Sequence, residues 1–229
     1  MATIGDLVRM IAQAEGIDEV SVDVYARRAR EAGFISQGGR GRSAPKMTVR
    51  DAANLLIAVN ASPTGREVHR IVPYFRELEL AGSNYTTAFF DEAEHYSGVV
   101  IHATTASSFG EALEILIEGA AEGTSLQDDL FGGKTPVTDS KLRRDFETVE
   151  QKMGAVNKPV LNVSFNQKAR GVRIAFLNEE VSHDPVIAEA QWTGPAPASD
   201  GDQEVTITIS DKTIVAVANL INGDNEFVE

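Results

Sequence analysis

Seven basic side chains lie between residues 21 and 50 of this 229-residue sequence, against two acidic ones. They are Arg27, Arg28, Arg30, Arg40, Arg42, Lys46 and Arg50. Arginine presents a planar fork of N–H donors that matches phosphate oxygens and the edge of guanine, and lysine adds a mobile positive charge. The chemistry that this set of residues could perform is therefore binding of a polyanion.

The rest of the chain has the opposite charge. Residues 1–76 hold 11 Lys and Arg against 8 Asp and Glu, a net charge of +3, whereas residues 77–229 hold 10 against 26, a net charge of −16. A phosphate-rich partner would be attracted to the first part and repelled by the second. If the chain binds phosphate groups, the basic segment is where it does so.

Helices are expected to position these basic residues. Apolar residues in helical spacing predict one helix over 4–15, stopped by Gly16, and a second over about 21–32, stopped by Gly33. Three of the arginines fall on the second helix, opposite its apolar stripe. A third helix is predicted over about 49–59. The expected N-caps are Thr3, Ser21 and Thr48.

The segment between the second and third helices is polar and rich in glycine. Phe34 and Ile35 could anchor a short strand before it. Gly38, Gly39 and Gly41 stand among the basic residues of the segment 36–46. Glycines at these positions permit a tight turn and a close approach of the backbone to a ligand.

Residues 20–48, which read VSVDVYARRAREAGFISQGGRGRSAPKMT, resemble the recognition helix and wing of winged helix-turn-helix domains. The helix that follows, with residues 51–56, is similar to that of small DNA-binding proteins of phages and prophages. The resemblance covers about 60 residues, a quarter of the chain. It implies that residues 21–50 bind double-stranded DNA and that Arg40 and Arg42 reach phosphate or the minor groove.

The remainder predicts a mixed body. A helix from Thr64 to about Leu80 is expected to kink near Pro73, Val99–His102 is expected to form a short strand, and Phe109–Glu122 an amphipathic helix. A loop over 123–136 and a charged helix over 138–153 are expected next. Alternating apolar residues predict strands over 160–165, 172–176, 186–192 and 204–209, followed by a strand or short helix over 213–220 and an acidic tail over 222–229.

These elements predict an α+β fold, with an N-terminal winged helix-turn-helix-like domain and a mixed α+β body that ends in a β region. The predicted divisions are a DNA-binding domain over 1–62, a mainly helical acidic region over 63–156 and a β-rich region over 157–229. The body is expected to remain folded when 1–62 is deleted.

No enzymatic chemistry is expected. The chain has no cysteine and no G-x-S-x-G motif. Residues 132–135, Gly-Gly-Lys-Thr, imitate the end of a phosphate-binding loop, but Asp128 stands where that motif needs glycine. Asp91 and His95, one helical turn apart and near His102, match no metal-binding spacing. We therefore expect no catalytic residue, no metal and no cofactor.

The first residues do not have the pattern of a signal peptide, and no apolar run approaches the ~18 residues of a membrane span. A cytoplasmic location without membrane contact is expected. The favoured function is a phage- or prophage-type transcriptional regulator, a homo-oligomer whose acidic body also binds a partner protein. A small-terminase-like adaptor for DNA packaging and an acidic DNA-mimicking inhibitor of a host defence system are the alternatives. An exposed basic surface that is merely solvated, or that binds RNA or protein, would use the same residues.

Overall fold

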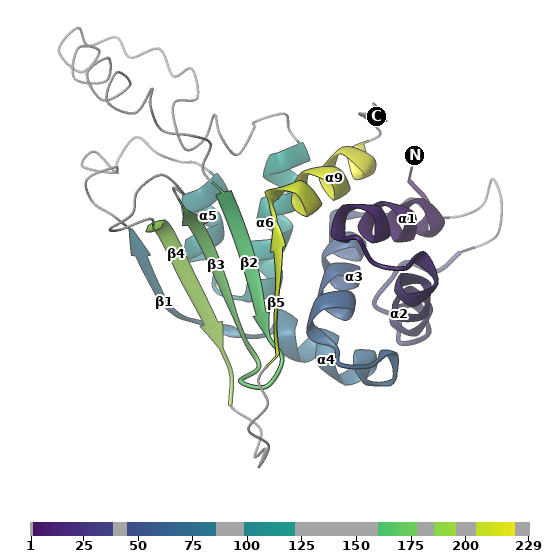
Figure 1. The fold of residues 1–229 in the computed structure, drawn as a ribbon, viewed down its shortest axis with the longest axis horizontal. Helices are drawn as coiled ribbons and strands as arrows, with labels where there is room; N and C mark the ends of the chain where they lie inside the picture. The colour runs from purple at the N-terminus through teal and green to yellow at the C-terminus, as the bar shows by residue number, and fades with distance from the viewer. Residues whose placement is uncertain are drawn as a thin grey trace, which may run out of the picture.

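A computed structural model describes residues 2–38, 45–85, 99–121, 160–177, 186–195 and 205–222. Within these ranges the chain forms seven α-helices and a five-stranded antiparallel sheet, so the predicted α+β class is confirmed (Figure 1). The helices are α1 (Ile4–Glu15), α2 (Glu19–Glu31), α3 (Val49–Ala61), α4 (Val68–Arg76), α5 (Val99–Thr105), α6 (Phe109–Ala121) and α9 (Asp211–Asn222), and the 3-10 turn η2 (Gly65–Glu67) precedes α4. The strands are β1 (Glu79–Tyr85), β2 (Val160–Asn166), β3 (Gly171–Leu177), β4 (Val186–Thr193) and β5 (Thr206–Ser210).

Local signals decide where the N-terminal helices begin. Thr3 and Thr48 are the N-caps of α1 and α3, as predicted, and each forms a capping box with an aspartate three residues later. The prediction that Ser21 caps α2 is wrong. The carboxylate of Asp18 accepts the Ser21 N–H at 3.0 Å, so the helix begins at Glu19. Asp18 is an equally good cap that stands one turn earlier.

Two further predictions are corrected. The helix expected from Thr64 to Leu80 begins as a 3-10 turn and ends at Arg76, because the chain then enters β1. The strand expected over Val99–His102 is the start of α5, whose buried residues, Val100, Ala103 and Thr104, have helical spacing. A short apolar run does not distinguish a strand from a buried helix. The loop predicted over 123–136, the helix over 138–153 and the tail from residue 223 on lie outside the described residues.

The sheet has the strand order β1-β4-β3-β2-β5. Leu161, Val163 and Phe165 of β2 are buried, and the alternate residues of the strand are partly exposed. Val163 is paired with Ile174 of β3 and Ile209 of β5, which are also buried. The four strands predicted after residue 159 are confirmed, and the segment over 213–220 is helical. One face of the sheet therefore supplies the apolar side chains that the helices cover.

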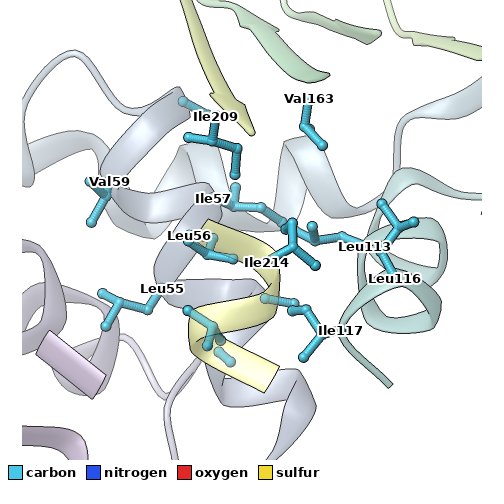
Figure 2. Close-up of a cluster of buried hydrophobic side chains, with 14 of the residues drawn as sticks. Leu55, Leu56, Ile57, Val59, Leu113, Leu116, Ile117, Val163, Ile209 and Ile214 are labelled. Carbon is cyan, nitrogen blue, oxygen red and sulfur yellow. The ribbon is translucent and has the colours of Figure 1, made fainter. Parts of the chain in front are cut away.

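Helix α3 lies at the centre of the core. Every residue from Asp51 to Ala61 is buried. Leu56 and Ile57 lie among side chains of α6, α9 and the sheet (Figure 2). Helix α3 thus contributes to one continuous core rather than to a separate N-terminal one. No helix in the described ranges is long and apolar enough to cross a membrane.

The predicted domain boundary near residue 62 crosses this core. Helix α1 packs against α9, near the other end of the chain, and α3 packs against α4 and α6 (Figure 1). The division of the chain into domains stays a prediction. The continuous packing leads us to expect that residues 1–62 and the sheet unfold together, and that deleting 1–62 exposes the apolar side of α6 and α9.

We expect Leu56→Ala to lower the free energy of unfolding by about 2–5 kcal/mol, because it leaves a cavity in the core. Trp192, the single tryptophan, is fully buried in β4 and reports on the sheet. In urea unfolding, Leu56→Ala should shift the transition midpoint measured by Trp192 fluorescence and the midpoint measured by far-UV circular dichroism by the same amount. Gln13→Ala, on the exposed side of α1, is the control and should change stability by less than about 0.5 kcal/mol. A fluorescence transition that Leu56→Ala leaves in place would mean that the two regions unfold separately.

Candidate nucleic-acid interface

Helices α1 and α2 are joined by only three residues, Gly16, Ile17 and Asp18. Gly16 adopts a left-handed conformation, with φ 66° and ψ 30°, which suits glycine because it has no Cβ. The N–H groups of Gly16 and Ile17 both donate to the carbonyl of Ala12. Asp18 then caps α2, so the chain leaves one helix and enters the next without a flexible linker.

Helix α2 presents one face to the core and the other to solvent. Val22, Ala26 and Ala29 are buried, and the helix packs against α1, α3 and α4. The small alanines allow these neighbouring helices to approach closely. Arg27 and Arg28 are exposed on the other side, so they are available to an external partner.

The structure places five of the seven predicted binding residues. Arg27 and Arg28 are exposed, Arg30 is half-buried, and Lys46 and Arg50 are exposed around the start of α3. Arg40 and Arg42 lie outside the described residues, as does the rest of segment 39–44. The flanking residues Phe34 and Ile35 form no strand, contrary to the expectation. Ile35 is buried and belongs to the hydrophobic core instead.

The two ends of segment 39–44 lie together. The Arg30 guanidinium donates to the carbonyl of Gly38 at 3.4 Å, and the Gln37 amide donates to the carbonyl of Arg30 at 2.7 Å. A Cβ on Gly38 would lie 2.8 Å from Cδ of Pro45, so only glycine fits this contact. Since Lys46 follows Pro45, Arg30 and Lys46 lie at the base of the segment that carries Arg40 and Arg42.

Asp51 holds this base closed. Its buried carboxylate accepts the backbone N–H and the hydroxyl of Ser36, at 2.7 and 3.0 Å, and those of Thr48, at 2.8 and 2.9 Å. A single side chain thus joins the residue that precedes the glycine-rich segment to the N-cap of α3. The sequence predicted Thr48 as the cap but gave no sign of the contact with Ser36.

A second polar contact ties this region to the body. The Asn54 side chain donates to the carbonyl of Phe34 at 2.6 Å and accepts from the Arg76 guanidinium at 2.9 Å. Arg76 also forms an ion pair with Glu114 of α6. The contacts run from Phe34, which precedes the glycine-rich segment, through α3 and α4 to α6, and they join the start of that region to the core.

The charges on this surface are only partly compensated. Arg28 pairs with Glu31 at 2.8 Å, whereas Arg27, Lys46 and Arg50 form no ion pair with another described residue. Glu19 in the first turn of α2 and the arginines in its last turn favour the helix dipole. Part of the charge pattern therefore stabilises the helix, and the uncompensated cations remain for a partner.

Sequence reasoning missed a neighbouring group of basic residues. Arg66, His69 and Arg70 are exposed in η2 and the first turn of α4. Gly65, beside Arg66, packs against Val24 and the stem of Arg28 of α2, so this group continues the basic surface of that helix. The spacing of the three residues, at i, i+3 and i+4, was a signal that they share one helix face.

A groove lies between the end of α1 and the edge of the sheet. Its volume is about 250 Å³. Its walls come from three elements far apart in the sequence: Ala14, Glu15 and Ile17 at the end of α1, Val59 and Asn60 at the end of α3, and Ile207, Thr208, Ile209 and Ser210 of β5, with Asn162 and Thr213 beside them. The sequence analysis singled out none of these residues.

Glu15 is the ionisable group of this groove. Burial raises the pKa of its carboxyl from 4.5 to about 7, and the hydrogen bond from Asn60 Nδ2, at 3.1 Å, partly opposes that rise. Asn60 is itself buried and also donates to the carbonyl of Leu56. The carboxylate therefore has one hydrogen-bond donor among the described residues and is costly to ionise.

Among the described residues, no group of three or more His, Asp or Glu is arranged to hold a metal ion. His102 is exposed on α5. Asp91, His95 and the Gly-Gly-Lys-Thr segment lie outside the described ranges. Comparison with protein families, curated proteins and solved structures finds no match to this chain. Function must therefore be inferred from the residues themselves.

We expect Asp51→Ala to destabilise the protein by about 2–4 kcal/mol, because it removes an N-cap interaction and leaves buried donors without an acceptor. The loss should begin at the base of the glycine-rich segment. In amide hydrogen exchange, the variant should exchange faster than the wild type at Ser36 and Thr48, and this acceleration should be larger there than at Leu56. Asp6→Ala, which removes the capping box of α1, is the matched control and should leave the exchange at Ser36 unchanged. Uniform acceleration in both variants would argue against a local role for Asp51.

The Glu15 carboxyl predicts a pH dependence of stability. Below about pH 4.5 it is neutral in the folded and unfolded states; as pH rises through 7, the folded state must carry a buried charge and loses stability. Glu15→Gln should therefore raise the melting temperature at pH 8 and leave it nearly unchanged at pH 4.5. The gain in the free energy of unfolding at pH 8 should be about 2 kcal/mol, after allowance for the partial exposure of Glu15. Glu118→Gln, on the exposed surface of α6, should not give this pattern. An equal effect of Glu15→Gln at both pH values would contradict the assignment.

Proposed function

We propose that this chain is a DNA-binding protein in which α1, the turn at Gly16 and α2 act as a helix-turn-helix unit. The observation that carries the proposal is the basic surface: Arg27 and Arg28 are exposed on α2, Lys46 and Arg50 are exposed around the start of α3, and Arg30 contacts Gly38 at the base of a glycine- and arginine-rich segment. A connection of three residues that contains glycine is the usual length in such a unit.

In this proposal α2 is the recognition helix. Its 13 residues span about 20 Å, at ~1.5 Å per residue, which suits the major groove. Arg27 and Arg28 extend from its outer face toward base edges and phosphates, where a bidentate arginine is the strongest contact. Segment 39–44, with Arg40 and Arg42, acts as the wing and reaches the phosphate backbone or the minor groove.

In this proposal Lys46 and Arg50, around the start of α3, also contact DNA phosphates. A helix N-terminus favours phosphate, and two exposed cations add to that preference. Arg66, His69 and Arg70 extend the same surface beyond α2. The net charge of −16 on residues 77–229 opposes contact between the body and DNA, so it orients the basic side toward the duplex.

The biological role that this favours is a phage- or prophage-type transcriptional regulator, which binds as an oligomer and uses its acidic body to contact a partner protein. The acidic body also motivates one alternative, a DNA mimic that occupies a basic groove on another protein. A DNA-packaging adaptor would use the same basic surface in a ring. The mass in solution separates the regulator from the packaging adaptor, because a dimer suits two-fold operators and a ring of about eight or more subunits suits packaging.

We expect the fourfold variant Arg27→Ala, Arg28→Ala, Lys46→Ala, Arg50→Ala to bind DNA much more weakly while it keeps its circular dichroism spectrum. For the wild-type chain and a random 30-base-pair duplex, the logarithm of the binding constant should fall with the logarithm of the salt concentration at a slope of about −4 to −5. For the variant, the magnitude of this slope should be smaller by about 3 to 4. Fluorescence anisotropy at several salt concentrations measures both quantities.

Lys212→Ala, which removes one exposed cation from α9, is the control and should keep the affinity and slope of the wild type. An unchanged slope in the fourfold variant would refute the site. If the wild-type chain binds no duplex even at low salt, DNA binding itself is refuted and the mimic becomes the better proposal.

A further inference from the structure

Strand β5 forms one edge of the sheet and pairs with β2 along Thr206–Ser210. Among the described residues, no backbone hydrogen bond reaches its outer edge. Natural proteins usually protect such an edge with charged residues, proline or a bulge. The sequence of β5, TITIS, has neither charge nor proline, and its register with β2 is regular. The opposite edge, β1, carries Glu79 and a register shift between Leu80 and Gly82.

The groove described above borders β5. Four consecutive residues of β5, from Ile207 to Ser210, line it, as the side of an edge strand does when both of its faces border a cavity. Ile17 stands across the groove on the α1 side with 36% of its surface exposed, and Val205, just before β5, is 40% exposed. These are two of the three large apolar side chains that are exposed among the described residues; Ile17 lines the groove, and Val205 stands two positions before Ile207, which also lines it.

Among the described residues that line this groove, the Glu15 carboxylate is the one charged group. From the described part of the chain it receives a single hydrogen bond, donated by Asn60, and it forms no ion pair there. Glu15 is half-buried, and a carboxylate that is largely withdrawn from water is normally compensated by a cation or by several donors. A cationic group that entered the groove would supply this compensation.

The size of the groove points to a side chain rather than a cofactor. A cavity of about 250 Å³ is smaller than the ~300–1,000 Å³ of typical sites for drug-sized ligands. An extended peptide needs no deeper site, because its backbone pairs with the edge strand and only alternate side chains require pockets.

We propose that this groove binds an extended segment of a partner protein, which adds to the outer edge of β5 and places a lysine or arginine side chain against Glu15. The backbone groups of β5 supply the pairing, Ile17 and Ile207 contact an apolar neighbour of that cation, and Glu15 selects its charge. The acidic body, with its net charge of −16, attracts a basic segment from a distance. This site does not depend on DNA binding, and its test contains no DNA.

Three capped eight-residue peptides test the proposal with the full-length protein. The first alternates threonine and valine around a central arginine, the second has glutamate in place of the arginine, and the third is the first with alternate backbone nitrogens methylated. We expect the arginine peptide to bind saturably at pH 8 in isothermal calorimetry. The glutamate peptide should bind at least about tenfold more weakly, and the methylated peptide should not bind, because it cannot pair with β5.

The protein variants separate charge from edge pairing. Glu15→Gln keeps the acceptor for Asn60 but removes the charge, so it should abolish the preference for arginine over glutamate, whereas Glu118→Gln should keep it. Equal binding of the two peptides by the wild type, an unchanged preference in Glu15→Gln, or no saturable binding up to about 1 mM would overturn the proposal. If the chain forms a dimer that Ile17→Lys or Val205→Lys dissociates, the edge belongs to a second copy and the partner segment is refuted.

Discussion

The buried carboxylate of Asp51 is the interaction on which the basic surface depends. It accepts four hydrogen bonds from Ser36 and Thr48, and it therefore closes the segment between them and starts α3 at the same time. Without this carboxylate, no side chain would join Ser36, before the glycine-rich segment, to Thr48 at the start of α3. Because α3 is buried from Asp51 to Ala61 and continues the contact through Asn54 to Arg76, the position of the segment's base is set by the core rather than by solvent-exposed ion pairs.

Sequence reasoning predicted those features that local chemistry determines. The N-caps Thr3 and Thr48, the end of α1 at Gly16 and the alternation of β2 all follow from residues within a few positions of one another. It misplaced the start of α2, because Asp18 and Ser21 are comparable caps and spacing alone does not rank them. It assigned the first four residues of α5 to a strand, because a run of three apolar residues, at 99–101, fits both periods.

The features that escaped prediction depend on contacts between distant parts of the chain. The groove joins the end of α1, the end of α3 and β5, and the hydrogen bond between Glu15 and Asn60 already spans 45 positions. Glu15 is the last residue of α1, and its sequence neighbours predict an ordinary solvent-exposed helix end. The packing of α1 against α9 accompanies its position beside β5 in the groove. The seven basic residues could be named from composition, but the contact that gathers Arg30 and Lys46 could not.

The two proposed sites share the turn between α1 and α2, since Ile17 lines the groove and Asp18 caps the helix that carries Arg27. A ligand shifts a conformational equilibrium only as far as it binds one state better than another. This turn is fixed on both sides: two N–H groups donate to Ala12, the conformation of Gly16 is set, and the Tyr25 hydroxyl of α2 donates to the carbonyl of Ser62 at 3.3 Å. A peptide in the groove would therefore meet a rigid wall, and we expect the groove and the basic surface to bind their partners independently.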